Sequence, residues 1–425
     1  MRILYYDWDE FNGRDLRDAM YRMGYHVDCF KADISGDKYR TGLETLIRDR
    51  LERYEDGRRF YDAVFSFDYF PELSEVCQKY GVSYTSWVFD CPHYPLFSDT
   101  IFNDVNRIHI FDRSLCNELT ARGAKNVFHT PLGVNKVRLT ELGLSLPETE
   151  KQENVSAYAS SDSSRSESRQ GQTDTSGRFI EPTYIHDVCF LGNLYDNEFN
   201  FYDQAKIPQD LKAYLDEVIL AQQKIFGRDI FSDERVINKE LLEVQGEPFR
   251  FENTGNYSID YYRVTLDILR KKTTVDERRK IIEELGKRYN TVIYTTPDAE
   301  PVPGVTNMGV ADYKTKMPYI FHNSKVNINI TLRCIPSGVP LRVMDVLAAG
   351  GFLITTYQEE IADYFEDGKD LVIVNTPEEM IELAGYYLEH DDERKEIAVN
   401  GQMKVFERFA YRKLLPRILG EEHDE

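Results

Sequence analysis

Hydrophobic and polar residues alternate along the segment from Val326 to Leu332, which has the two-residue period of a strand with one buried face. Pro340, a favoured first helical residue, then opens a run with apolar residues at helical spacing. The glycines at 350 and 351 end this run before a second apolar stretch at residues 352–356. The pattern predicts a strand, a Pro-Ser-Gly loop, a helix and a strand, which together form a βαβ unit.

The start of the predicted helix is a natural anion site, because unpaired backbone N–H groups and the helix dipole face the carboxyl end of the preceding strand. Arg342 and Asp345 are expected near the same end. A diphosphate with an attached ribose would suit this arrangement.

The first 135 residues repeat the alternation of strand-like and helix-like patterns, which predicts a parallel, doubly wound sheet. The expected strands are Arg2–Tyr6, His26–Phe30, Ala63–Phe67, Ser83–Phe89, Arg107–Phe111 and Asn126–Thr130. The expected helices include Asp15–Met23, Leu43–Tyr54, Glu72–Tyr80 and Leu115–Arg122.

A change of composition divides the chain, because residues 148–177 are rich in Ser, Glu, Gln and Thr and predict a disordered linker. Order resumes with a buried strand at Ile185–Leu191, and a charged helical region follows. Alternation then returns with a helix at Asp276–Tyr289, a strand at Thr291–Thr295 and a last helix at Lys395–Leu419. We expect an N-terminal Rossmann-like domain at 1–140, a linker at 141–183, a second Rossmann-like domain at 184–405 with an insertion at about 200–275, and a C-terminal helix and tail at 406–425.

Charge narrows the class of partner. The 425 residues include 52 Lys and Arg against 73 Asp and Glu, a net charge of −21, so nucleic acid is not an expected partner.

The six cysteines are scattered without a CxxC pair, which indicates reduced core residues in a cytoplasmic protein. No stretch approaches the roughly 18 apolar residues of a transmembrane segment.

Several segments together resemble a known family. The C-terminal half, above all PSGVPLRVMDVLAAGGFLIT, resembles the group 1 (GT4-like) glycosyltransferases of GT-B fold, in particular the CgeB-like branch. The segments SWVFDCPHYPLF, RIHIFDR and HTPLGVN resemble the uncharacterised domain that usually precedes a CgeB-like half. The resemblance implies an α/β fold with two doubly wound Rossmann-like domains facing a central cleft, and a nucleotide-diphosphate sugar as substrate.

In retaining enzymes of this family, two glutamates lie eight positions apart, the first near the donor sugar and the second on the ribose. The matching positions here are Ser337 and Asp345, so the first departs from the pattern. Backbone N–H groups of Ser337 and Gly338 would face the diphosphate, with Arg333 and Arg342 as its candidate cations.

The resemblance also points to residues on neighbouring loops. Gly192 and Asn193 match the family's first glycine turn, although the expected basic residue after it is missing from NLYDNEFN. Tyr313 lies in a segment that resembles the lining of the base pocket.

The N-terminal domain offers candidates for the acceptor side. Trp87, Asp90 and His93 end a predicted strand, where Asp90 or His93 could serve as a base, and Asp112 follows another strand. Asp7-Trp8-Asp9 spells a metal-binding DxD signature, but its place after the first strand does not suit that use, and no metal site or cofactor is expected.

These observations lead to one main hypothesis and two alternatives. The main hypothesis is a hexosyltransferase-type enzyme, metal-independent and retaining, acting on a protein, glycan or small-molecule acceptor that the sequence does not identify. The alternatives are a nucleotide-sugar-binding or spore-surface assembly protein without turnover, kept open by Ser337, and a nucleotide-sugar epimerase.

Overall fold

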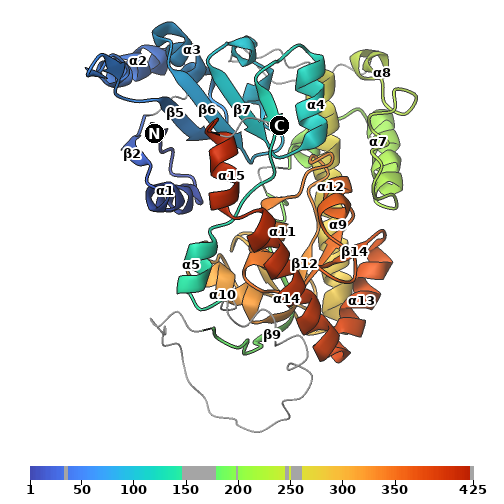
Figure 1. Ribbon diagram of the computed structural model, residues 1–425. Helices are drawn as coiled ribbons and strands as arrows, with labels where there is room; N and C mark the ends of the chain where they lie inside the picture. Colours follow the sequence, from blue (N-terminus) through green and yellow to red (C-terminus); the bar gives the residue numbers. More distant parts are fainter. Residues whose placement is uncertain (33–36, 146–178, 198–199, 245–247, 250–260, 422–425) are drawn as a thin grey trace.

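Two parallel sheets form the centre of the molecule, one in each half of the chain (Figure 1). The computed structural model describes residues 1–32, 37–145, 179–197, 200–244, 248–249 and 261–421. Most of the expected Ser-rich linker, residues 146–178, lies outside this part of the chain.

The first sheet has the strand order β2-β1-β5-β6-β7-β8, and every pairing in it is parallel. Its strands are β1 (Arg2–Tyr6), β2 (His26–Phe30), β5 (Ala63–Phe67), β6 (Ser83–Val88), β7 (Asn106–Ile110) and β8 (Val127–His129), as the alternation predicted to within a residue or so. The accompanying helices are α1 (Gly13–Arg22), α2 (Asp37–Leu51), α3 (Pro71–Tyr80) and α4 (Arg113–Ala121), and a two-strand hairpin is made by β3 (Tyr54–Glu55) and β4 (Arg58–Arg59). The next helix, α5 (Lys136–Glu141), packs its Leu139 into the core of the second domain.

Burial on both faces explains why β1 is almost wholly apolar. Leu4 and Tyr6 join the core on one side of the sheet, and Ile3 and Tyr5 join the core on the other. Strands covered by helices on both faces lose the polar half of the two-residue alternation. The same reasoning applies to Ala63–Phe67, whose five residues are all buried.

The second sheet has the order β11-β10-β9-β12-β13-β14 and is also parallel throughout. Its strands are β9 (His186–Leu191), β10 (Thr291–Tyr294), β11 (Val305–Asn307), β12 (Ser324–Asn329), β13 (Leu353–Thr356) and β14 (Val372–Val374). Its helices are α9 (Tyr261–Arg288), α10 (Lys316–His322), α11 (Leu341–Ala348), α12 (Glu359–Tyr364), α13 (Pro377–Glu389) and α14 (Asp391–Arg408). The predicted βαβ unit is confirmed as β12, α11 and β13.

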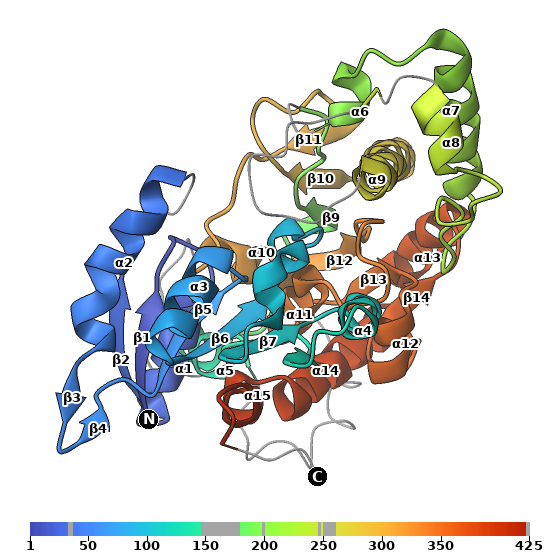
Figure 2. The ribbon, with the colours of Figure 1, turned by 90° about the horizontal axis from the view of Figure 1, so that it is seen from above.

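Helices of an insertion stand beside the second sheet, at the side that faces α4 (Figure 2). They are α6 (Phe201–Gln204), α7 (Gln209–Gln222) and α8 (Lys239–Val244), and they pack with α9 around a core of their own. The predicted helix Asp276–Tyr289 was too short, because α9 begins at Tyr261 and spans 28 residues. Its first turns project past the sheet and are covered by the insertion.

The chain returns to the first domain at its end (Figure 1). The predicted single helix Lys395–Leu419 was wrong, because α14 ends at Arg408 and α15 (Tyr411–Ile418) begins a new direction. Between them the Phe409 carbonyl accepts from Val134 N, and Tyr411 N donates to Val134 O. This bridge breaks the helix and directs α15 onto α1, where Leu415 and Ile418 are fully buried.

Candidate functional site in the interdomain cleft

The loop from β12 to α11 meets the first domain at the end of β7. Both backbone N–H groups of Ser337 and Gly338 donate to Asp112 Oδ2, each at 2.8 Å. Asp112 is fully buried and also caps α4, where its Oδ1 accepts from Leu115 N at 2.8 Å. Burial raises the pKa of Asp112, while the amides that donate to its carboxylate act in the opposite direction.

This contact requires glycine at position 338. A Cβ there would lie 2.8 Å from Phe111 Cδ2 and 3.0 Å from Asp112 Cα, so a larger residue would push the two domains apart. The sequence placed Ser337, Gly338 and Asp112 near a cleft separately, and the structure brings them together. Their amides do face an anion, and that anion is a carboxylate of the first domain.

Glu360, at the second residue of α12, extends the contact between the domains. Its Oε1 accepts from Ser337 Oγ at 2.9 Å and from Arg113 N at 2.7 Å, and its Oε2 lies 2.6 Å from His129 Nε2. Ser337 Oγ in turn accepts from Ser114 N at 3.0 Å. We call Asp112, Ser337, Gly338 and Glu360 the interdomain clamp. Glu360 was not among the residues singled out from the sequence, where it stood as one of many surface-like acids.

Asp345 lies one turn into α11, beside residues of the first domain. Tyr313 Oη donates to its Oδ1 at 3.3 Å, and Arg342 Nη1 lies 3.3 Å from its Oδ2. Burial raises the pKa of Asp345 to about 6, against the opposing effects of Arg342 and Arg138. The structure therefore brings three of the predicted donor-side residues together.

A cavity beside Asp345 is nearly closed. Arg138 and Tyr313 line it, and its volume of about 10 Å³ is enough for roughly one water. Arg138 comes from α5 and is held by Asp15 at 2.8 Å, with its guanidinium 5.4 Å from the Tyr313 ring centre. The side chains of Arg138 and Tyr313 therefore fill most of the space next to Asp345.

The two predicted cations are engaged within the second domain. Arg333 forms a bidentate pair with the buried Glu277, at 3.1 Å from Nε and 2.5 Å from Nη2. Arg342, besides Asp345, contacts the Met317 sulfur at 2.8 Å. Arg333 lines the open pocket described below. Arg342 does not line that pocket and lies beside Asp345 instead.

A further arginine, Arg278 on α9, reaches the carboxyl ends of the central strands. Its guanidinium donates to Ile330 O at 2.7 and 3.1 Å and to Asn193 O at 2.5 Å, which places it between β9 and β12, where the strand order reverses. It is 8% exposed and forms no ion pair with another described residue, and burial lowers its pKa. Gly192 and Asn193 lie at the same point, so Arg278 supplies a positive charge where the loop after β9 lacks one.

Sequence reasoning missed Arg278, although one signal was present. Arg278 stands three residues after Val275 and three before Ile281, both of which are buried. A charged residue on the apolar stripe of an amphipathic helix is unusual unless it has buried partners. The expectation of a helix starting only at 276 hid that stripe.

The carboxyl edge of the first sheet carries an acidic cluster. The ligand atoms of Asp68, Asp90 and His93 lie within 4.8 Å of one another, a spacing that could also hold a metal ion. Asp68 is 1% exposed and accepts from Phe89 N and Asp90 N at 3.0 and 3.2 Å. Burial raises the pKa of Asp68 to about 7, and burial together with the neighbouring Asp68 raises the pKa of Asp90 to about 7.

The other residues named at this edge take different places. His93 is partly buried, its Nε2 lies 2.9 Å from Tyr69 O, and burial lowers its pKa. Trp87 is fully buried and stacks on Phe67 in the core. In the DxD-like segment, Asp7 pairs with Arg17 at 3.1 Å, and Asp9 pairs with Lys31.

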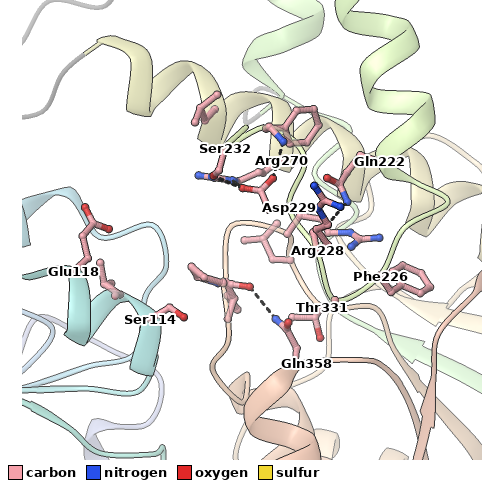
Figure 3. A pocket seen from close by; sticks show the side chains of 18 of the residues that line it. Ser114, Glu118, Gln222, Phe226, Arg228, Asp229, Ser232, Arg270, Thr331 and Gln358 are labelled. Atoms are coloured by element: carbon pink, nitrogen blue, oxygen red, sulfur yellow. Dashed lines mark hydrogen bonds and ion pairs between the residues drawn. The ribbon is translucent and has the colours of Figure 1, made fainter. Parts of the chain in front are cut away.

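An open pocket of about 670 Å³ lies between the first domain, the insertion and the second sheet (Figure 3). Ser114 and Glu118 project from α4 on one side, and Gln222, Phe226 and Arg228 of the insertion stand on the other. Thr331 and Gln358 come from the ends of β12 and β13. Ile335 and Pro336 also line the pocket, and they directly precede Ser337 of the interdomain clamp.

Comparisons with known proteins bear on the second domain and on the fold. A family model described as glycosyl transferase-like matches residues 273–420. No curated protein matches the sequence. Among solved structures, a glycosyltransferase from Rickettsia africae aligns over 99% of this chain and 97% of its own, at 8% identity and a TM-score of 0.50.

Other solved structures of similar extent are more distant in shape. Sucrose-phosphate synthase from Thermosynechococcus elongatus aligns over 99% of this chain and 98% of its own, at 10% identity and a TM-score of 0.47. HepE from Anabaena, solved in complex with UDP-glucose, aligns over 99% of both chains, also at 10% identity and a TM-score of 0.47.

Two parallel Rossmann-like domains whose carboxyl edges meet at a cleft define the GT-B fold, which is the fold class expected from the sequence. The family match at residues 273–420 and this fold agree with a glycosyltransferase, and the resemblance to group 1 enzymes is supported at that level. None of the helices in the described part of the chain has the length and apolar character of a membrane span.

Proposed function

We propose that the protein transfers a sugar from a nucleotide-diphosphate donor to the hydroxyl of an acceptor, as a group 1 enzyme of the CgeB-like branch. The observation that carries this proposal is the pair of amides of Ser337 and Gly338, which already hold an anion at the strand ends between the two domains. Two convergent N–H groups at a helix start suit a phosphate as well as a carboxylate.

The donor would be held by groups of the second domain. Its phosphate would take the position of the Asp112 carboxylate on the two amides, and its ribose would take the place of Arg138 beside Asp345. Arg278 supports this arrangement, because its buried charge at the point where the strand order reverses lacks a carboxylate partner among the described residues. Asp112 belongs to the first domain, so a separation of the domains would free the phosphate position. Arg138 is on α5, which packs on the second domain through Leu139, so its side chain would leave Asp345 by a rotation that the loss of its ion pair with Asp15 of the first domain would permit.

The proposed reaction breaks the bond between the anomeric carbon and the diphosphate and forms a bond to the acceptor oxygen. Negative charge builds up on the leaving diphosphate, where fixed N–H groups and Arg278 would stabilise it. We take the reaction as retaining and free of a metal or other cofactor, with the acceptor's proton passing to the leaving diphosphate. These three features rest on the resemblance to group 1 enzymes.

An inverting reaction would need a base in the first domain. Asp90 is the candidate, because it lies at the carboxyl edge of the first sheet beside Asp68 and His93 and its pKa is raised to about 7. The anomeric configuration of the product, read by proton NMR, decides between the two courses.

The ribose assignment has a specific test that does not depend on turnover. Affinities of ribo- and 2′-deoxyribonucleoside diphosphates would be measured for the wild type, for Asp345→Ala and for Asp312→Ala, an exposed aspartate on the preceding loop. We expect the wild type and Asp312→Ala to prefer the ribonucleotide by about tenfold, the equivalent of one good hydrogen-bonded contact. Asp345→Ala should lose that preference, and a preference that survives would remove Asp345 from the ribose site.

A second candidate function is nucleotide-sugar binding without turnover. The clamp favours it, because Asp112 already occupies the phosphate position and Ser337 stands where related enzymes carry an acid near the sugar. Release of a nucleoside diphosphate from a nucleotide sugar, whether by transfer or by hydrolysis, would exclude this candidate. Binding with intact donor after long incubation would support it.

A further inference from the structure

The open pocket beside the clamp differs in charge from the rest of the molecule. Five arginines and three carboxylates line it, a balance of +2 in a chain whose net charge is −21. Such a local excess of cations favours an anionic ligand over a neutral one.

Three of the five are neutralised inside the pocket wall. Arg333 is held by Glu277, and Arg270 is held by Asp229 at 2.6 Å and by Asp267 at 2.8 Å. Arg263 pairs with Glu118 at 2.5 Å across the boundary between the insertion and the first domain. These ion pairs hold the walls of the pocket together. The three arginines in them are already neutralised, so they attract a ligand's negative charge only weakly.

The remaining two arginines supply the excess. Arg122, at the C-terminus of α4, lies 4.8 Å from the centre of the Phe97 ring and forms no ion pair with another described residue. Arg228, on the insertion, is 70% exposed, and its nearest carboxylate, Asp233, is 4.0 Å away. Asp233 is already bound by both ends of the Arg235 guanidinium, at 2.6 and 2.9 Å. The first domain and the insertion thus each contribute one arginine without a close acidic partner.

The other side chains suit a sugar. Phe226 and Tyr357 offer aromatic surface, and Thr331 and Ser232 offer hydroxyl groups. Rings and hydroxyls of this kind bind the two faces and the edges of a pyranose. The volume of about 670 Å³ falls in the usual range for a small-molecule site.

The pocket also adjoins the proposed reaction centre. Ser114 and Pro336 line it, and each is next in sequence to a residue of the contact between the domains, Arg113 and Ser337. A ligand in the pocket would therefore lie beside the position proposed for the donor's phosphate.

We infer that this pocket binds the acceptor, and that the acceptor is a sugar carrying a phosphate or a carboxylate group. The acceptor role rests on the proposed function. Arg122 of the first domain and Arg228 of the insertion supply the positive charge that favours the anionic group, and the insertion, through Arg228, determines which acceptors fit. Arginine suits either group, because its fork of N–H donors matches the two oxygens of a carboxylate or a phosphate.

The test measures binding in the absence of any donor, so it does not depend on turnover. Isothermal titration of the whole protein would use a panel of hexose 6-phosphates, the corresponding hexuronates and the parent hexoses. The variants are Arg122→Gln, Arg228→Gln and, as a matched control, Lys206→Gln, which changes an exposed cation of the same insertion outside the pocket. Thermal unfolding of each variant verifies that it is folded.

We expect at least one acidic sugar to bind, and to bind at least tenfold more tightly than its parent hexose. Arg122→Gln and Arg228→Gln should each weaken that binding about tenfold, and Lys206→Gln should not change it. Preference for the phosphates or for the uronates identifies the anionic group. The inference is overturned if no acidic sugar binds, if hexoses bind equally well, or if Lys206→Gln weakens binding as much as Arg228→Gln.

The outcomes separate this inference from the proposed function. An acidic sugar that binds through the two arginines, in a protein that turns over no donor, would refute the transferase proposal and leave an anionic-sugar site. Donor turnover with a pocket that binds no acidic sugar would refute the acceptor assignment alone.

Discussion

Asp112 provides the most informative perturbation in the molecule. Replacing it with asparagine keeps the side-chain shape and retains a group able to cap α4, because asparagine caps helices about as well as aspartate. The substitution removes the charge that two backbone amides now bind. If the carboxylate occupies the donor's phosphate position, Asp112→Asn should bind a nucleoside diphosphate more tightly than the wild type does.

The size of the effect follows from the clamp. A hydrogen bond to a charged group contributes about 1.5 kcal/mol or more, and the two amide contacts at 2.8 Å together contribute about 3 kcal/mol to closure. Asparagine has one accepting oxygen in place of two, so it can cap α4 or accept from the two amides but not both, and we take a net change of about 2 kcal/mol in closure. Affinity falls in proportion to the fraction of binding-competent molecules, which makes the expected gain roughly 30-fold.

Equilibrium titration with a nucleoside diphosphate measures this directly, because binding requires no turnover. Asp104→Asn is the matched control, since Asp104 is an exposed aspartate just before the other end of β7. Its affinity should equal that of the wild type. If Asp112→Asn binds the nucleotide no better than these two proteins, its carboxylate does not compete with a phosphate, and the proposed phosphate position is wrong.

Three further predictions concern the same cleft. Gly338→Ala places a Cβ 2.8 Å from Phe111 and should lower the free energy of unfolding by about 1–3 kcal/mol in urea titrations, whereas an unchanged value would mean that the contact is loose. Because burial raises the pKa of Asp68 to about 7, the folded state binds its proton more tightly than the unfolded state, so wild-type stability should fall by up to about 4 kcal/mol as pH rises from about 4 to about 7. Asp68→Asn should flatten that dependence in thermal unfolding across the same range, and an unaltered slope would assign it to other groups. Asp90→Asn should lower kcat less than tenfold if the diphosphate takes the proton, and a loss of a hundredfold or more would indicate that Asp90 is the base.

The fold could be predicted from the sequence because both sheets are built from local patterns. The strand Arg2–Tyr6 is an apolar run, and the segment around β12 alternates apolar and polar residues. The Pro-Ser-Gly loop, the helical spacing that follows and the two glycines before β13 mark the remaining boundaries of that unit in the sequence. The break between α14 and α15 was not visible. It depends on hydrogen bonds between Val134 and residues 409–411, and such distant backbone pairing leaves no local pattern.

The site was predictable only in part, for the same reason. The motif at 336–355 indicated an anion site, and the amides of Ser337 and Gly338 do face an anion. That the anion is Asp112, 225 residues earlier in the chain, follows from the packing of one domain on the other. Arg278 and the pocket beside α4 depend on the long projection of α9 and on the insertion, whose charged sequence gave no indication of what it covers.

We propose that this protein turns over a nucleotide sugar in the interdomain cleft. Phosphorus NMR of a panel of nucleotide sugars, incubated with the wild-type protein and the acidic sugars of the acceptor panel, detects such turnover. For at least one donor, we expect the paired diphosphate resonances to be replaced by those of a nucleoside diphosphate with a terminal phosphate. Nucleotide sugars that bind the protein but keep their resonances unchanged would contradict it.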